Sequence, residues 1–241
     1  MPGPLNVAAA IAAAATQAGQ DDPNVRRADV RTGTVTAVGA AGTVDVGDVR
    51  ARRLESYQRP TVGDQVLLVQ SGSGNWWAAG RTATAASPLG EPLYKYKAAP
   101  TDRANTTTFA DDPDLTMQLD ATAVYVVEFH LFVGGPSAGL MVTAWTTPAS
   151  AGGLKGVHGP GSAATDTAAD NISMRAGSHG FGTTITYGRR NTNTNLLYAI
   201  ETGVVTTTSA GTCALSWAPS ASNATATRMG LGSWMRATRV A

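Results

Sequence analysis

This sequence has one cysteine, few charged residues and almost no net charge, and the low cysteine count and the low net charge each exclude classes of protein. The 241 residues include one cysteine, Cys213, which excludes an internal disulfide framework and a cysteine-rich zinc cluster. Charged residues make up 15% of the chain, and 18 basic against 17 acidic side chains give a net charge of +1. This balance provides no electrostatic footprint for nucleic acid or for an anionic membrane surface. With 43% hydrophobic residues, the chain suits one large or two smaller globular domains.

A long hydrophobic run is also absent. The uncharged run from Leu5 to Ala18 is shorter than the ~20 apolar residues of a membrane-spanning helix, so we expect no membrane insertion. It also fits a signal peptide poorly, because no basic residue precedes it and the first charged residue is Asp21. We predict that residues 1–20 form a short Ala-rich helix, ended at Gly19, that serves oligomerisation or attachment. A frayed tail is the alternative, because an isolated Ala-rich helix is only marginally stable.

Residues 24–84 have the spacing of short strands and tight turns. Valines recur in short stretches that glycines interrupt, and the segment Gly39-Ala40-Ala41-Gly42 predicts a hairpin turn. A turn at 60–64, a buried strand at 65–70 and a last strand at 75–81 follow. About five strands in about sixty residues fit a small closed barrel of the oligonucleotide/oligosaccharide-binding (OB) type. Residues 21–97 carry ten basic and eight acidic groups, so we expect no nucleic acid partner.

The second half of the chain predicts an antiparallel β-sandwich. Residues 85–104 contain several prolines and predict a linker, whereas residues 105–241 carry longer strands. The clearest strand is 124–133, which has one fully apolar face and places Glu128 and His130 on the other. Further strands are predicted at 140–145, 181–187, 196–200, 213–217 and 233–240. Because no helical stretch separates them, the fold class is mainly β, with a C-terminal jelly roll.

The residues that catalysis or metal binding needs form no recognisable pattern. The histidines are His130, which lies in a strand, and His158 and His179, which are predicted in glycine-rich loops; none has metal-binding spacing. The acidic stretch 111–114 lacks the register of a calcium loop, and its proline predicts a turn, although clustered carboxylates leave calcium as an alternative. Cys213 falls on the apolar face of a predicted strand, as a structural thiol does. We therefore expect no metal, no cofactor and no enzymatic activity.

Two features are candidates for recognition. A polar loop between two predicted strands carries two guanidinium groups and three amides that could bind glycan hydroxyls or acidic groups, namely Arg189, Arg190, Asn191, Asn193 and Asn195. A solvated hairpin loop is the simpler interpretation of that composition. The second feature is the pair Trp76 and Trp77. Adjacent strand residues face opposite ways, so at most one tryptophan fills the barrel and the pair indicates a subunit interface.

Two parts of the chain resemble known phage proteins. Residues 34–81 resemble the small barrel near the start of siphophage minor tail and baseplate proteins, which carry a Y-x-P-x-x-G-D-x-V turn and strand and a G-R ending. The matching positions are Tyr57, Pro60, Gly63, Asp64, Val66, Gly80 and Arg81, with one extra residue between Tyr57 and Pro60. Residues 106–240, notably TTTFADDPDLTMQLDATAVYVVEFHLFV and GSWMRATRV, resemble a C-terminal domain of actinobacteriophage virion proteins.

This resemblance implies a structural protein of a bacteriophage virion, most closely a minor tail or tail-tip protein. Its N-terminal part is expected to attach to other tail or capsid proteins, and a homotrimeric sandwich is expected to face the glycans of the host envelope. Glu128 and His130 are then predicted at the seam between subunits. A capsid fibre or decoration protein is the nearest alternative. A secreted carbohydrate-binding module or glycan hydrolase is the alternative from another class.

Overall fold

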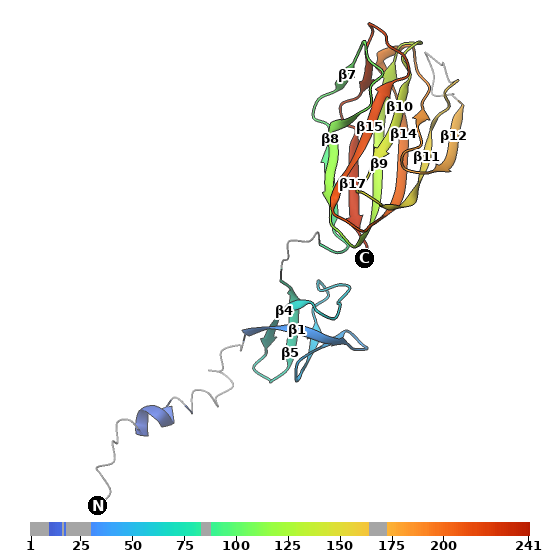
Figure 1. Ribbon diagram of the computed structural model, residues 1–241. Coiled ribbons are helices and arrows are strands. Elements are labelled where there is room, and N and C mark those ends of the chain that lie inside the picture. The colour runs from blue at the N-terminus through green and yellow to red at the C-terminus, as the bar shows by residue number, and fades with distance from the viewer. Residues whose placement is uncertain (1–9, 16, 18–29, 83–87, 164–172) are drawn as a thin grey trace, which may run out of the picture. The chain divides into compact units, whose positions relative to one another are not determined.

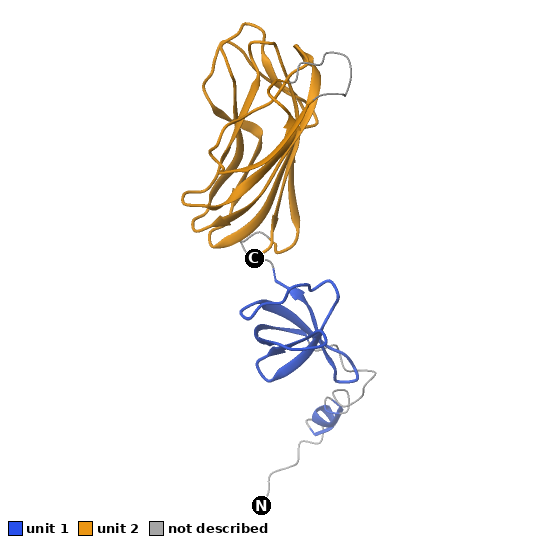
Figure 2. Ribbon diagram, turned by 90° about the vertical axis from the view of Figure 1, so that its right-hand side faces the viewer, with its two compact units in different colours: residues 1–84 blue, residues 85–241 orange. Residues whose placement is uncertain are grey.

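Strands make up nearly all of the regular structure in the computed structural model (Figure 1), which describes residues 10–15, 17, 30–82, 88–163 and 173–241. The chain divides into two units, residues 1–84 and 85–241 (Figure 2). Residues 10–15 and 17 are helical, and the rest of the helix predicted over 1–20 lies outside the described residues. Within the described ranges, no helical segment combines the length and hydropathy of a transmembrane helix.

The first unit contains the predicted OB-type barrel. Its strands are β1 (Val30–Val38), β2 (Thr43–Val46), β3 (Val49–Arg53), β4 (Gln65–Gln70) and β5 (Trp76–Arg81). They close in the order β1-β2-β3-β5-β4, with β4 returning to β1 and with β3 and β5 parallel. The predicted hairpin turn joins β1 to β2, where the Gly39 amide donates to the Thr43 carbonyl over 3.0 Å. The glycine-punctuated valine pattern thus predicted both the strand count and the closure.

Three residues of the quoted turn motif meet at one end of β4. The Tyr57 hydroxyl donates to Asp64 Oδ2 over 2.6 Å, and Arg81 Nη1 lies 3.4 Å from Asp64 Oδ1. Thr61 donates to the same carboxylate through its amide and its hydroxyl. Burial alone raises the pKa of Asp64, but the bonds from Tyr57 and Thr61 and the charge of Arg81 outweigh it and lower the pKa. These motif residues therefore connect the turn before β4 to the end of β5 and stabilise it.

The second unit is a jelly roll. Its eight central strands are β8 (Ala110–Leu119), β9 (Ala123–Gly135), β10 (Met141–Thr146), β11 (Gly152–Pro160), β12 (Met174–His179), β13 (Ile185–Thr186), β14 (Thr192–Thr207) and β15 (Gly211–Pro219). The small sheet has the order β13-β10-β15-β8, and the large sheet contains the run β12-β11-β14-β9. Each neighbouring pair is antiparallel. This interleaving of first with last strands across two sheets is the double Greek key of a jelly roll.

Four more strands extend the large sheet beyond β9. They are β6 (Pro92–Tyr96), β7 (Thr101–Arg103), β16 (Thr227–Met229) and β17 (Trp234–Arg239). Both β16 and β17 pair with β9, and they are followed outward by β7 and β6 respectively. The prediction of a linker over 85–104 is therefore wrong where β6 and β7 lie. Pro92 suggested a linker because proline donates no ladder hydrogen bond, but proline is compatible with the start of an edge strand.

The space between the two sheets is filled by aromatic and aliphatic side chains that surround the buried carboxylate of Glu201. The rings of Phe129 and Trp145 meet edge to face at 4.9 Å, and Trp145 stacks on Phe181 at 5.5 Å. Glu201 on β14 accepts bonds from Lys155 Nζ (3.0 Å), Trp145 Nε1 (2.8 Å), the Tyr187 hydroxyl (2.9 Å) and the Thr143 hydroxyl. Buried polar groups are tolerated only when they are satisfied in this way.

Candidate interaction surface on the large sheet

The side of the large sheet that faces away from the small sheet is called the outer face here. On β9 the odd-numbered residues from Tyr125 to Val133 are fully buried between the sheets, as the alternation of the sequence predicted. The even-numbered residues Glu128, His130 and Phe132 lie on the outer face and are partly exposed. The corresponding outer residues of the neighbouring strands include large exposed apolar side chains: Tyr94, Tyr96, Leu154, Met174, Tyr198 and Val204.

Aromatic rings cross four adjacent strands of the outer face. This aromatic row consists of Tyr94 and Tyr96 on β6, Trp234 on β17, His130 and Phe132 on β9, and Tyr198 on β14. The ladder brings them together because Trp234 pairs with Tyr96 on one side and with His130 on the other. The His130 and Trp234 rings stack at 3.8 Å, and the Phe132 and Tyr198 rings lie 5.4 Å apart. Tyr96 is 70% exposed, so much of the row is open to a partner.

The charged side chains within the row neutralise each other. Arg236 on β17 donates to Glu128 on β9, and the carboxylate of Glu128 lies 4.0 Å from His130 Nε2. Burial lowers the pKa of His130, and the charge of Arg236 acts in the same direction against the opposing charge of Glu128. The imidazole is therefore neutral at pH 7, and His130 Nδ1 bonds to the Tyr198 hydroxyl. The outer face thus carries this ion pair and, farther along the sheet, the pair of Arg228 with Asp102, and both pairs are internally neutral.

Next to the aromatic row the outer face is aliphatic. Leu154 on β11 pairs with Val204 on β14, and Val204 pairs with Val126 on β9. These side chains line a shallow hollow together with neighbouring threonines and glycines. Six strands at ~4.8 Å spacing, over about six residues of length, give the face an area on the order of 500 Å². Polar side chains share this area with the apolar ones, and exposed apolar patches of roughly 300–600 Å² on a folded domain commonly mark a site of interaction.

Glu128 and His130 thus lie together on an exposed, largely apolar face, where the sequence placed them. Trp76 and Trp77 are elsewhere: they belong to β5 of the barrel. Trp76 packs against the barrel core with the Arg31 guanidinium 4.4 Å above its ring, and Trp77 is half-buried beside it. Sequence reasoning found the two β9 residues by alternation but missed the aromatic row, since its members come from four strands that are far apart in the chain.

The polar segment predicted as a recognition loop is partly a strand and partly self-paired. Thr192 to Asn195 begin β14, and the loop itself ends at Asn191. Arg189 Nη1 donates to Asn191 Oδ1 over 2.9 Å, and Arg190 Nη1 donates to Asn195 Oδ1 over 3.2 Å. Two of the three predicted amides, with Asn193 between them, therefore accept bonds from the guanidinium groups beside them. This arrangement agrees with the interpretation as a solvated turn.

The residues considered for metal binding occupy strands. His158 lies within β11 and His179 ends β12, so the prediction of glycine-rich loops for both is wrong. The acidic stretch 111–114 lies inside β8, where the register of β8 against β15 shifts, so Pro113 marks a bulge and not a turn. The described ranges contain no group of three or more His, Cys, Asp or Glu side chains that could hold a metal ion.

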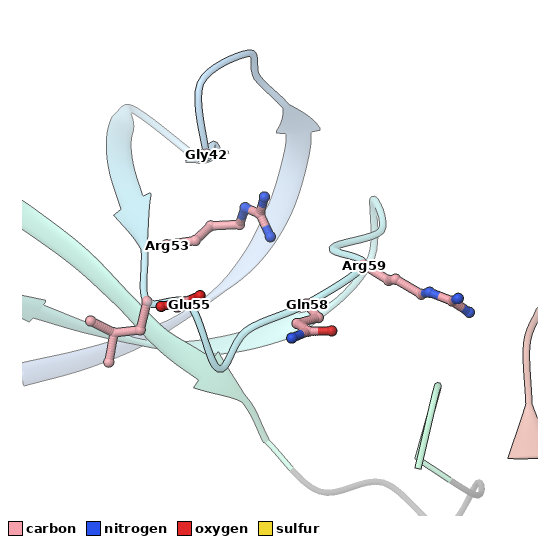
Figure 3. Close-up of a pocket in the computed structure, with 6 residues that line it drawn as sticks. Gly42, Arg53, Glu55, Gln58 and Arg59 are labelled. Atoms are coloured by element: carbon pink, nitrogen blue, oxygen red, sulfur yellow. The ribbon is translucent and has the colours of Figure 1, made fainter. Parts of the chain in front are cut away.

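The barrel also has an open hollow at its surface. It is lined by Gly42 after β1, by Arg53 and Glu55 at the end of β3, and by Gln58 and Arg59 in the following loop (Figure 3). Figure 3 shows Arg59 extending away from Arg53, so the two guanidinium groups do not converge on one point. Arg53 Nη1 already donates to the Tyr57 carbonyl over 2.6 Å. The outer face of the large sheet is therefore the better candidate for a functional surface.

Comparison with known proteins gives little further information. No protein-family model matches the chain, and no curated protein matches it. Two solved structures from infectious bursal disease virus are similar to it: the Gx strain structure (14% identity, TM-score 0.17, 87% of this chain and 53% of that chain) and the VP2 subviral particle (13%, 0.15, 89% and 58%). The chain thus spans little more than half the length of either. TM-scores of this size do not establish a shared fold.

Proposed function

We propose that this chain is a structural protein of a bacteriophage virion, a minor tail or tail-tip protein that assembles as a homotrimer. Its barrel unit attaches to neighbouring tail or capsid proteins, and its sandwich faces the host surface and its glycans. The observation that carries the proposal is the outer face of the large sheet, a broad apolar surface on an otherwise well-packed jelly roll. The resemblance of residues 34–81 and 106–240 to phage tail and virion proteins supports it.

A second copy of the chain is the occupant that the outer face favours. Its ion pairs, Arg236 with Glu128 and Arg228 with Asp102, are each satisfied within one subunit, so a neighbouring subunit packed on the face meets no unpaired charge from these groups. Closed symmetric homo-oligomers are the commonest assemblies of soluble proteins. An area on the order of 500 Å² in the plane of the sheet approaches the ~800 Å² per partner of a standard interface once side-chain relief is included.

The test is the solution mass of the full chain by size-exclusion chromatography with light scattering. We expect a mass near three times 24.6 kDa. Val204→Lys places a charge on the exposed outer face and should give monomers, and replacing Glu128 and His130 together by alanine should weaken the trimer. Val62→Lys is the matched control, because Val62 is an exposed valine that belongs to the barrel unit and not to the sandwich. A wild-type monomer at micromolar concentration would contradict the trimer, and antibody labelling of virions tests the location.

A carbohydrate-binding module is the second candidate, because exposed rings beside hydrogen-bonding side chains also suit sugar rings. The aromatic row offers Tyr94, Tyr96 and Trp234 next to Arg236 and the tyrosine hydroxyls. Glycan binding by a monomeric wild-type protein, lost in Trp234→Ala, would favour this function. A trimeric wild type that binds no glycan, and that becomes monomeric in Trp234→Ala, would favour the virion protein.

A further inference from the structure

Two of the three lysines of this chain are fully buried. Lys97 and Lys155 are 0% exposed and Lys95 is exposed, and the other 15 of the 18 basic residues are arginines. Arginine is the usual choice for a buried ion pair, because its planar guanidinium matches a carboxylate and never loses its proton. A lysine amine can lose a proton and act as a nucleophile. Lysine at these positions therefore suggests amine chemistry.

The amine of Lys97 is held against two carboxylates. Its Nζ lies 2.8 Å from Asp112 Oδ1 and 2.7 Å from Asp114 Oδ2, and it donates to the Thr101 hydroxyl at 2.7 Å. The Lys97 backbone is fixed by two hydrogen bonds with the turn before β17, one to the Ser233 carbonyl and one from the Gly232 amide. The Lys97 side chain thus extends from the end of β6 into the sandwich, and its Nζ contacts the two carboxylates of β8.

The carboxyl group of Asp112 is fixed and surrounded by donors. It is 0% exposed, and its Oδ2 accepts from Trp217 Nε1 over 3.0 Å. Its Oδ1 accepts from the amides of Asp114 and Leu115 over 3.0 and 3.2 Å. When an amine adds to a carboxyl carbon, negative charge collects on the carboxyl oxygens, and donors placed beforehand stabilise that charge. Burial also keeps competing water away from the carbon.

Asp114 differs from Asp112 in its exposure. Its side chain is 43% exposed, so the carboxylate touches the Lys97 amine on one side and solvent on the other. A carboxylate in this position can take a proton from the amine and pass it on. Lys155 lacks such a second group: in the described part of the chain its one carboxylate contact is Glu201, which accepts three further side-chain bonds.

We propose that Lys97 and Asp112 join spontaneously in an intramolecular amide bond, with Asp114 as the catalytic base. Asp114 takes a proton from the Lys97 ammonium, and the free electron pair of Nζ attacks Cγ of Asp112. A C–N bond forms and one C–O bond of Asp112 breaks. That oxygen leaves as water with the two protons that the ammonium loses, relayed by Asp114, which ends as it began. An ammonium and a carboxylate thus become an amide and water, with no oxidant or reductant.

The product removes a buried ion pair, which by itself is weak evidence for stability because desolvation opposes the attraction. It also joins the segment after β6 to β8 by a covalent bond. The first strand of the sandwich, β6, is an edge strand whose ladder partner in the described part of the chain is β17. The bond would keep the sandwich closed at this edge when the ladder opens.

The test is the intact mass of the folded full-length chain, with peptide mapping. The wild type should be lighter than its sequence by the mass of one water, and digestion should give one pair of peptides joined at Lys97 and Asp112. Lys97→Arg and Asp114→Asn should both have the full mass of their sequences. Lys95→Arg, two residues away and exposed, is the matched control and should keep the loss of water.

Asp112→Asn gives an independent signature. Its carboxamide reacts with the Lys97 amine by loss of ammonia, so the joined product has the same mass as the joined wild type. If the buried substitutions do not fold, Asp114→Asn still decides, because that side chain is partly exposed. Folded wild-type protein with the full mass of its sequence, and no joined peptides, would overturn the proposal and leave the contact as an ion pair.

Discussion

Loss of the buried carboxylate of Glu201 should strongly destabilise the sandwich. Glu201→Gln keeps the shape of the side chain but leaves the fully buried Lys155 ammonium without a counter-charge. Breaking a buried ion pair by removing one partner costs about 3–5 kcal/mol of the free energy of unfolding. Urea unfolding of the two proteins measures the difference. Asp102→Asn, which breaks the partly exposed pair with Arg228, should cost below about 1 kcal/mol.

Cys213 should be chemically silent in the folded protein. Its thiol lies in the core, where burial, together with the charge of Asp111, raises the pKa to about 12. Against an unfolded thiol of pKa near 8.5, this lowers the thiolate fraction at about pH 8 on the order of a thousandfold. We expect alkylation by iodoacetamide only after denaturation. Rapid alkylation under native conditions would show that the strand carrying Cys213 opens.

At the scale of single residues, the sequence correctly predicted which strand side chains point into the core and which point outward. It placed Cys213 inside and Glu128 and His130 outside because side chains on a strand alternate with period two. It could not identify Lys97 with Asp112, or Lys155 with Glu201, as pairs. Those contacts join strands that are distant in the chain, and a charged residue in an apolar stretch gives no sign of its partner.

Among the elements, the turn before β4 depends on ionised Asp64. Its pKa is lowered on folding, so the stabilisation is fully present above the ordinary pKa of 3.8 and is lost as the pH falls through the lower, folded value. Asp64→Asn should destabilise the barrel by about 1–3 kcal/mol at pH 7, since it weakens charged hydrogen bonds. The difference from wild type should shrink at about pH 3. Urea unfolding at both pH values checks this, and an unchanged difference would contradict it.

Strand prediction succeeded where apolar residues alternate and failed where they do not. β4 lies at 65–70 as expected, and β9, at Ala123–Gly135, contains the predicted 124–133. The prediction missed six strands because their sequences are short, glycine-rich or interrupted by proline: β6, β7, β8, β11, β12 and β16. Ladders with strands that are distant in the sequence, such as β6 with β17 and β11 with β14, hold such segments in the sheet, and this tertiary pairing overrides their weak local preference.

At the scale of the whole molecule, the barrel and the sandwich each enclose their own core. One cluster of buried residues, from Val35 to Ala78, belongs to the barrel, and the other, from Leu115 to Ala237, belongs to the sandwich. A unit with a closed sheet and its own core is able to fold alone. The composition change near residue 84 indicated this division, whereas the aromatic row that crosses four strands could be seen only once the topology was known.

We therefore expect two separate unfolding transitions and a fragment 85–241 that folds without the barrel. In the full chain, Asp64→Asn should move only the transition of the barrel, because the side chains around Asp64 all belong to β4, β5 and their turns. Glu201→Gln should move only that of the sandwich. Differential scanning calorimetry of the two variants, with circular dichroism of the fragment, measures this. Because an oligomer is stabilised by mass action, the sandwich transition should also rise with protein concentration while that of the barrel stays fixed. A single transition that both substitutions shift would contradict the independence of the two units.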